Sequence, residues 1–230
     1  MRRENTLELA LTGLLTSIII LMAFTPLGYI PLVVINATII TIPVIIGSLF
    51  CGPKKGAFLG FVFGLTSFIK NTVMPSSLSA FVFSPVLAAS VIGPSGIIKS
   101  TFICFVPRIL VGVVPYFVYR GIRKLFKSEK AIADTLPFAL AGFLGSMTNT
   151  LLVMPAIYVL YREPYAEALS MSPDAILGMI GGVIGGQGLI EAIVAAVLVT
   201  ALGMVLRKVK PVYRPAEKKN VKAEAVQQAA

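Results

Sequence analysis

The sequence contains no histidine, no tryptophan and only two cysteines. Without histidine the chain cannot form a Ser-His-Asp triad, a Cys-His dyad or a histidine-ligated zinc site. Cys51 and Cys104 lie in separate apolar runs and form no CxxC motif, so neither redox chemistry nor a disulfide framework is indicated. The HExxH, GxSxG and Walker A motifs are also absent, so the sequence does not indicate an enzyme or a nucleotide site.

Charged residues are scarce as well: they make up 13% of the 230 residues, whereas hydrophobic residues make up 57%. The mean hydropathy is +0.90. Ordinary soluble domains carry roughly 25% charged residues. A soluble fold of this length cannot bury so much apolar surface, so we expect an integral membrane protein whose apolar excess faces lipid.

The apolar runs predict an all-α bundle of six transmembrane helices, because a spanning helix needs about 20 mostly apolar residues. The expected spans are residues 7–24, 36–51, 57–68, 98–119, 135–158 and 176–206. We take residues 1–207 as one membrane domain. Residues 208–230 are rich in Lys, Glu, Ala and Gln without an apolar period, and we expect a basic, disordered cytoplasmic tail.

The basic residues predict the orientation of the bundle. The chain has 20 Lys and Arg against 10 Asp and Glu, a net charge of +10. Most of the basic residues lie at the N-terminus, in residues 54–55 and 120–130, and in the tail, all on one expected side. The opposite side holds only Lys70, Lys99 and Arg162. The positive-inside rule therefore places both termini in the cytoplasm and explains the charge without nucleic acid.

Two ionisable residues lie deep inside expected spans, where charge is costly and functional roles are common. Arg108 lies about midway along the fourth span, and Glu191 lies at a comparable depth in the sixth. The two side chains could pair with each other and hold the bundle together. Alternatively, Arg108 could face a cavity and bind an anionic group, since its fork matches a carboxylate. The two interpretations are compatible.

Uncharged polar residues lie near the same level. Asn149 offers both a donor and an acceptor, and Gln187 precedes Glu191 by one turn on the same helix face. Each could bind a ligand or form an interhelical hydrogen bond. The glycines of residues 181–188 lack the Lys-Ser/Thr ending of a phosphate loop and are more typical of close backbone approach.

Two further segments are candidates for binding. Residues 26–31, with Tyr29, and residues 71–85, with Phe83 and Ser84, form apolar, proline-flanked loops on the expected outer side. Such loops could close over a ligand, or their aromatic residues could anchor the protein at the membrane interface.

Gly13 and Ser17 lie one turn apart on one face of the first span. Small residues at this spacing let a second helix approach closely. That helix could belong to a partner protein or to this bundle.

Several motifs occur in an order that resembles a known family. They are residues 11–17, 43–47 with 52–57, 61–65, 106–112 and 188–193. Over about the first 207 residues the chain resembles the substrate-binding S components of energy-coupling-factor (ECF) vitamin transporters. Similarity to the pantothenate-specific branch is carried by residues 25–31, 36–38 and 81–85.

The resemblance implies a prokaryotic plasma-membrane protein with six helices that captures a vitamin, here pantothenate, from outside. It would deliver the vitamin by docking on a transmembrane scaffold subunit driven by two ATPase subunits. The chain itself would not be an enzyme and would bind no cofactor or metal. The ATP would be used by the partner ATPase subunits. The family's AxxxA docking motif falls on Gly13 and Ser17, which are small but not alanine.

The expected vitamin site combines the candidate residues above. It comprises Arg108, Asn149, Tyr29, Asn36, Ser84, Phe83, Gln187 and Glu191. Arg108 suits the carboxylate of pantothenate, and Asn149 and Gln187 suit its hydroxyls and amide.

Two alternatives stay open. The chain could be an S component for riboflavin, folate or a thiamine precursor, although the lack of tryptophan disfavours ligands that need extensive stacking. It could also be a membrane protein of another class, although the missing catalytic motifs weigh against an enzyme.

Overall fold

The computed structural model describes residues 2–25, 28–31, 36–125 and 132–208. Within these residues the protein is nearly all helical. The α-helices are α1 (Arg2–Ala23), α2 (Thr41–Cys51), α3 (Pro53–Val73), α4 (Pro85–Ile92), α5 (Ser95–Val111), α6 (Val114–Leu125), α7 (Ile132–Ala168), α8 (Ala175–Val183) and α9 (Leu189–Lys208). The remaining elements are a 3₁₀ turn η1 (Ala80–Phe83), a π-helical turn η2 (Ile184–Gly188) and two strands, β1 (Tyr29–Pro31) and β2 (Asn36–Thr38). Apart from Lys208, the expected tail lies outside the described residues.

The second expected span is wrong in its first part. Residues 36–38 form a strand that pairs antiparallel with β1, and helix α2 begins only at Thr41. The all-α expectation therefore missed a short hairpin. Helix α2 has 11 residues, which at ~1.5 Å per residue reach about half-way across a hydrocarbon core of about 30 Å. It ends at Cys51. The next residue, Gly52, has a φ of 86° that permits a sharp turn, and α3 starts immediately at Pro53.

The other expected spans are helical but end elsewhere. The fourth is divided into α5 and α6, and the sixth into α8, η2 and α9. The fifth continues to Ala168 as α7, with a non-helical residue, Tyr161, inside it. Helix α4 and η1, in the segment between α3 and α5, were not expected as helices, because their apolar runs are short.

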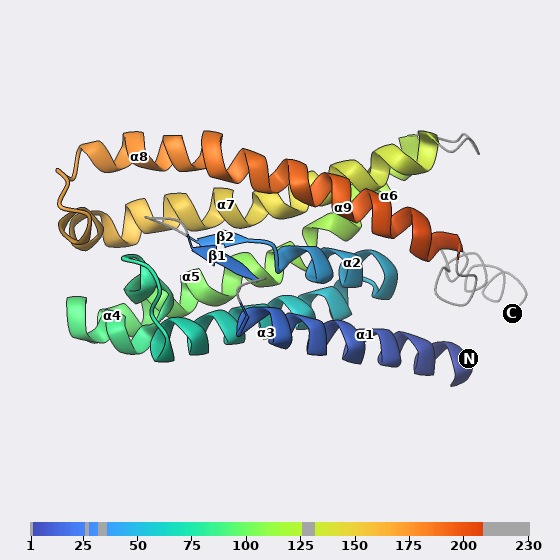
Figure 1. Cartoon of the computed structure of the whole chain (residues 1–230), viewed down its shortest axis with the longest axis horizontal. Helices are drawn as coiled ribbons and strands as arrows, with labels where there is room; N and C mark the ends of the chain where they lie inside the picture. The colour runs from blue at the N-terminus through green and yellow to red at the C-terminus, as the bar shows by residue number, and fades with distance from the viewer. Residues whose placement is uncertain (1, 26–27, 32–35, 126–131, 209–230) are drawn as a thin grey trace, which may run out of the picture.

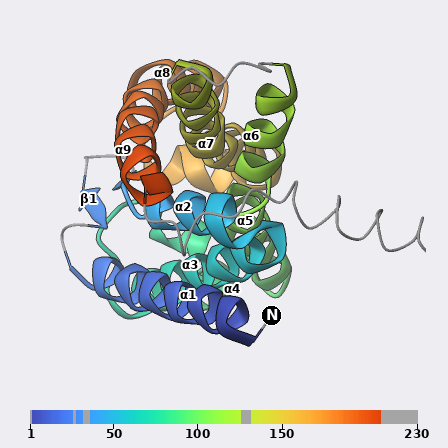
Figure 2. The same cartoon turned by 90° about the vertical axis from the view of Figure 1, so that its right-hand side faces the viewer.

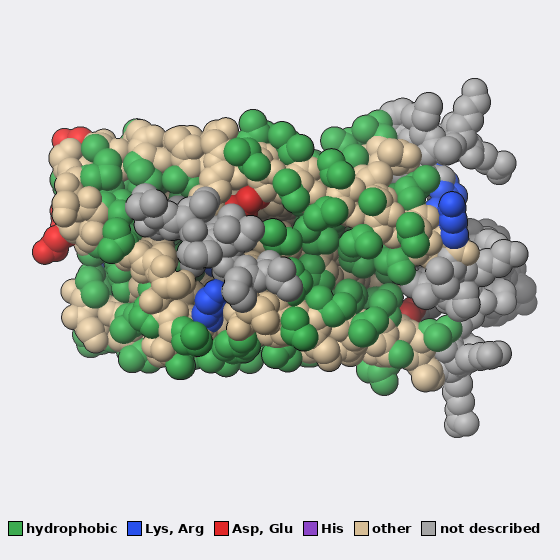
Figure 3. All heavy atoms as spheres, in the orientation of Figure 1, with side chains coloured by type: hydrophobic (Ala, Val, Ile, Leu, Met, Phe, Trp, Pro, Cys, Tyr) green, Lys and Arg blue, Asp and Glu red, His purple; other side chains and the backbone are tan. Residues whose placement is uncertain are grey.

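Among the described residues, five helical segments are long and apolar enough to cross a membrane. They are Thr6–Ala23, Pro53–Val73, Ser95–Leu125, Thr135–Ala168 and Ala175–Lys208. Their outward faces carry large apolar side chains, including Leu21, Ile98 and Val159. Figure 3 shows apolar side chains spread along the length of the molecule, with few charged groups among them. This surface suits lipid, whereas soluble monomers rarely expose such extensive apolar surface.

The helices form two layers with α2 and α5 between them. Figures 1 and 2 show α1, α3 and α4 on one side and α6, α7, α8 and α9 on the other. The first turn of α1 and the last turn of α9 lie at the same end of the bundle (Figure 1). One apolar core lies among α1, α2 and α3, and a second among η1, α5, α7 and α8.

Helix α3 approaches α5 unusually closely through a row of glycines. Gly56, Gly60 and Gly64 recur every four residues, so they share one face of α3. A Cβ atom added at Gly60 would overlap the carbonyl oxygen of Arg108, and one added at Gly64 would lie 2.9 Å from the carbonyl oxygen of Cys104. The Cys104 thiol also donates to the Gly64 carbonyl at 3.2 Å. The absence of side chains on this row therefore sets the distance between the two helices.

We predict that Gly60→Ala destabilises the protein by about 1–3 kcal/mol, because the added methyl group must push α5 away from α3. Gly13→Ala is the matched control, since an added Cβ there meets no atom within 4 Å. Melting temperatures of the detergent-solubilised proteins provide the measurement. An equal or higher melting temperature for Gly60→Ala would contradict the importance of this contact.

Candidate ligand-binding site

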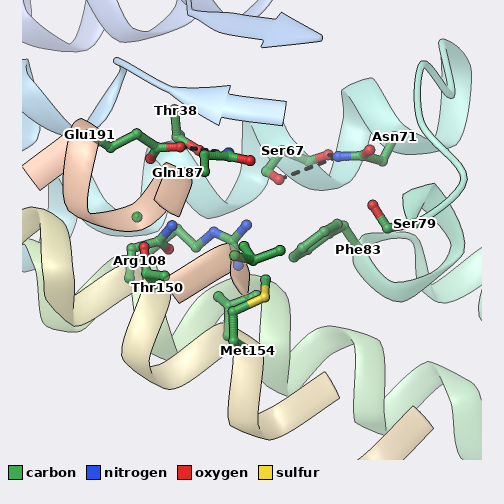
Figure 4. Close-up of a pocket in the computed structure, with 14 residues that line it drawn as sticks. Thr38, Ser67, Asn71, Ser79, Phe83, Arg108, Thr150, Met154, Gln187 and Glu191 are labelled. Atoms are coloured by element: carbon green, nitrogen blue, oxygen red, sulfur yellow. Dashed lines mark hydrogen bonds between the residues drawn. The ribbon is translucent and has the colours of Figure 1, made fainter. Parts of the chain in front are cut away.

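A polar pocket lies between α3, α5, α7 and the junction of α8 with α9, beside β2 and η1 (Figure 4). Five of the eight expected binding residues line it, and they are Phe83, Arg108, Asn149, Gln187 and Glu191. Its empty volume, counting the open mouth, is about 540 Å³. The fold thus brings together polar residues from distant parts of the chain.

Arg108 is held in this pocket by a hydrogen bond that the neighbouring Pro107 makes possible. Pro107 has no N–H, so the Ile103 carbonyl four residues earlier loses its normal helical donor. The Nη1 atom of Arg108 donates to that carbonyl at 2.6 Å. The guanidinium carbon also lies 4.7 Å from the centre of the Phe83 ring and 5.5 Å from that of Phe63. These contacts stabilise a side chain that is only 4% exposed.

Glu191 and Gln187 lie one turn apart on one face, at the junction of the π-helical turn η2 with α9. Gln187 lies within this turn and Glu191 follows in the first turn of α9. The Gln187 Nε2 atom donates to Glu191 Oε1 at 2.7 Å. Arg108 and Glu191 thus each have a hydrogen-bond partner of their own in the described structure. Such π turns occur frequently at functional sites, since they redirect neighbouring side chains.

The glycines around η2 differ in their surroundings. A Cβ added at Gly188 would lie 2.7 Å from Thr150 Cγ2, so this glycine permits the close approach of α7. Additions at Gly181, Gly182 and Gly185 would meet no described atom within 4 Å. Close approach, which the sequence predicted for the whole segment, is confirmed at Gly188 among the described residues.

Asn149 presents an acceptor to the pocket from α7. Its side chain is 8% exposed, and its Oδ1 atom has no hydrogen-bond partner within the described part of the protein. A buried carbonyl oxygen without a partner is unfavourable. This acceptor is therefore a candidate contact for a polar ligand.

The three remaining candidates for ligand contact differ in what the structure places around them. Ser84 is fully buried outside the pocket lining. Its hydroxyl lies 2.7 Å from that of Thr72 and accepts from the Leu87 backbone N–H at 3.3 Å, which caps α4. Tyr29 and Asn36 lie in β1 and β2, and their side chains are outside the described part of the structure.

Sequence reasoning did not single out five polar residues that line the pocket, although two of them lie within the candidate segment 71–85. They are Thr38, Ser67, Asn71, Ser79 and Thr150. Asn71 Nδ2 donates to the Ser67 carbonyl at 2.8 Å and lies 3.4 Å from its hydroxyl (Figure 4). The four-residue spacing of this pair within an apolar helix was a usable signal, because two polar residues on one membrane-embedded face need a common environment.

The pocket offers hydroxyl, amide and carboxylate side chains and one buried guanidinium. In the described ranges, no three His, Cys, Asp or Glu side chains come together as metal ligands would. With an apolar helical exterior, this chemistry defines a membrane protein that binds a small polar molecule between its helices.

Comparison with known proteins gives the family. Residues 7–203 match the family model described as "ECF transporter, substrate-specific component". The chain therefore belongs to the substrate-specific components of ECF transporters. It is a multi-pass membrane protein and a transporter component, not an enzyme.

Two relatives are similar over most of the chain. The pantothenic acid transporter PanT of Lactococcus lactis subsp. cremoris is 36% identical over 178 residues, which cover 76% of this chain and 80% of the relative. The pantothenate transporter PanT of Leuconostoc mesenteroides subsp. mesenteroides is 28% identical over 211 residues, 90% of this chain and 95% of the relative.

We predict that Asn149→Leu leaves the ligand-free protein as stable as the parent or more stable. Leucine has the same branched shape and number of side-chain heavy atoms, and it removes a buried acceptor that lacks a described partner, a change worth up to about 1–2 kcal/mol. Thermal unfolding without ligand measures the effect. Thr148→Val is the control, because Thr148 lies beside Asn149 on the same helix but is only partly buried. A marked fall in melting temperature for Asn149→Leu alone would show that the amide serves the fold.

Proposed function

We propose that this protein is the S component of an ECF importer and that it captures pantothenate from outside the cell. The proposal rests first on the two relatives, whose names give pantothenate as their substrate. The observation that carries it in this chain is the buried guanidinium of Arg108 in a polar pocket. Pantothenate combines one carboxylate with hydroxyls and an amide, and this pocket has groups of matching chemistry.

In this proposal each pocket residue binds one part of the ligand. Arg108 binds the carboxylate, because its planar fork offers paired donors to two oxygens. Asn149 and Gln187 bind the amide and hydroxyls, and the Glu191 carboxylate accepts from a hydroxyl. A cation and a carboxylate in one pocket favour a ligand that has one anionic group and a neutral polar remainder.

We further propose six crossings, with both termini in the cytoplasm of a plasma-membrane protein. If only the five long segments crossed the membrane, the first turn of α1 and the last turn of α9 would lie on opposite sides of it. These two turns instead lie at the same end of the bundle (Figure 1). The short α2, extended by the hairpin, supplies the sixth crossing. Lys54 and Lys55 lie at the start of α3, Arg123 in the last turn of α6 and Lys208 in the last turn of α9. These helix ends lie at this same end of the bundle (Figure 1), as the positive-inside rule requires of a cytoplasmic side.

The partners in this proposal are a transmembrane scaffold subunit and two ATPase subunits, which use ATP, while this chain carries no cofactor. Gly13 and Ser17 on α1 form the docking face. Both are exposed, and an added Cβ at Gly13 meets no atom within 4 Å. The Ser17 hydroxyl donates to the Gly13 carbonyl at 3.1 Å, so its polarity is satisfied within the helix. Such a face allows a partner helix to approach closely.

The direct test of the ligand is mass spectrometry of the small molecule that co-purifies with the protein, followed by calorimetric titration with pantothenate. Riboflavin, folate and a thiamine precursor serve as competitors. Tight binding of one of these instead of pantothenate would replace the proposed substrate and leave the family unchanged.

We predict that Arg108→Lys weakens pantothenate binding, since lysine keeps the charge but loses the fork. Arg108→Ala should weaken it further, by about 2–5 kcal/mol, because the ligand carboxylate is left buried without its partner. Calorimetric titration measures both affinities.

Arg123→Lys is the control for this series, because Arg123 lies outside the pocket lining, near the end of α6. Circular dichroism and the melting temperature identify variants that have lost their fold. Unchanged affinity in folded Arg108→Ala protein would overturn the assigned role of this arginine.

We predict that Gly13→Leu and Ser17→Leu leave pantothenate binding by the isolated protein intact but reduce co-purification with the scaffold subunit and vitamin uptake. A bulky side chain on this exposed face obstructs a partner without disturbing the bundle. Leu9→Ile, on an exposed position of the same helix, is a volume-conserving control. Simultaneous loss of ligand binding and complex formation would reject the docking assignment in favour of internal packing.

A further inference from the structure

Tyr161, which lies outside the pocket lining, has an unusual setting. It is fully buried, and its φ of −135° and ψ of 17° depart from helical values inside α7. The break has a chemical cause in Pro164, which lacks the N–H that would bond the Leu160 carbonyl. Lys99 Nζ donates to that carbonyl at 3.3 Å from α5. A specific interhelical contact thus stabilises the break at Tyr161.

The Tyr161 hydroxyl connects α7 to η1 through α5. Its oxygen lies 2.8 Å from Ser100 Oγ and 3.1 Å from the Gly96 carbonyl, and Ser100 Oγ lies 3.1 Å from the Phe81 carbonyl. The hydroxyls of Tyr161 and Ser100 have two protons between them, so they can donate in only two of these three contacts. In one assignment Tyr161 donates to Ser100 and Ser100 donates to the Phe81 carbonyl, which gives a continuous relay from α7 through α5 to η1. The Gly96 carbonyl is then the alternative acceptor for the tyrosine proton.

The turn η1 is held on two sides. On the side of α7, the Phe81 ring packs edge-on against the Tyr161 ring at 5.8 Å. On the side of α3, the Thr72 and Ser84 hydroxyls lie 2.7 Å apart. The hydrogen bonds described above for this turn, from Ser100 to the Phe81 carbonyl and between Thr72 and Ser84, join neutral groups, so each is weak enough to break and reform.

The position of η1 affects the pocket directly. Phe83, its last residue, lines the pocket and places its ring 4.7 Å from the Arg108 guanidinium carbon. Ser79, which immediately precedes the turn, also lines the pocket. Figure 4 shows both side chains along one side of the site. Movement of η1 would therefore remove part of the pocket wall and one aromatic contact of Arg108.

We propose that the relay from Tyr161 through Ser100 to the Phe81 carbonyl is a latch that keeps η1 closed against the pocket. Tyr161 is then a positioning residue that controls how fast ligand enters and leaves without touching it. Opening leaves buried polar groups at Ser100 and Phe81 without their partners, so the closed state is favoured. Only the ligand's identity rests on the function proposed above.

The first test compares Tyr161→Phe and Ser100→Ala with the parent protein. Phenylalanine keeps the ring against Phe81 and removes only the hydroxyl. Tyr158→Phe is the matched control, because Tyr158 lies one turn earlier and packs against Arg162 instead. Association and dissociation rates of labelled pantothenate are measured by rapid filtration, together with melting temperatures.

The latch predicts that Tyr161→Phe and Ser100→Ala each raise the dissociation rate about three- to tenfold, the effect of losing one buried neutral hydrogen bond. The association rate should rise as well, so the dissociation constant changes less than either rate. The dissociation rate of the double variant should be no higher than that of either single variant, because both substitutions break the same relay. Faster dissociation with an unchanged or slower association rate would indicate damage to the site and overturn the latch.

A second measurement does not depend on pantothenate. A nitroxide label introduced through Leu78→Cys, at an exposed position beside η1, should become more mobile in ligand-free Tyr161→Phe and Ser100→Ala proteins but not in Tyr158→Phe. If the parent fails to bind pantothenate but the label becomes more mobile in the two variants as expected, the proposed substrate is wrong and the latch stands. Unchanged label mobility in folded variants rejects the latch. Ser100→Ala decides the outcome if Tyr161→Phe does not fold.

Discussion

The close contact of α3 with the backbone of α5 is the constraint on which the candidate site depends. Gly60 presents no side chain where it meets the carbonyl of Arg108, so the two helix axes approach until backbone touches backbone. In lipid, where apolar burial contributes little to helix association, such dispersion contacts supply much of the affinity. The same contact determines how far the Arg108 side chain reaches into the space between α3 and α7. A wider separation would move the guanidinium away from Phe63 and Phe83.

Two proline residues create carbonyls that cationic side chains then satisfy. Pro107 leaves the Ile103 carbonyl to Arg108, in the pocket, and Pro164 leaves the Leu160 carbonyl to Lys99, near the proposed latch. A freed carbonyl in a membrane-embedded helix is costly unless another donor reaches it. In both places the donor is a long basic side chain that becomes fixed in the process. Helix breaks and fixed charges are thus two consequences of one sequence feature.

The division between apolar exterior and polar interior gives the protein its function as a transporter component. Lipid-facing positions are apolar along the length of the bundle, whereas hydroxyl, amide and charged groups meet in one pocket between two apolar cores. Neutral groups such as Asn149 and Gln187 give directional contacts, and Arg108 gives a charge. A site of this kind can bind a small anion from water and release it once the neighbouring segment moves. This combination agrees with the family to which the chain belongs.

The sequence by itself determined the class of protein, the apolar segments and the buried ionisable residues, because composition and hydropathy are local properties. It therefore predicted Arg108 and Glu191 as a pair worth attention. It did not predict the hairpin around residues 29–38, the shortness of α2 or the row of glycines on α3, since each depends on which faces meet. Only the tertiary structure showed that the carbonyl freed by Pro107 binds Arg108 and that Ser84 caps a helix. The physical reason is that a buried polar group is assigned its role by the partner that reaches it, and helix packing decides which partner that is.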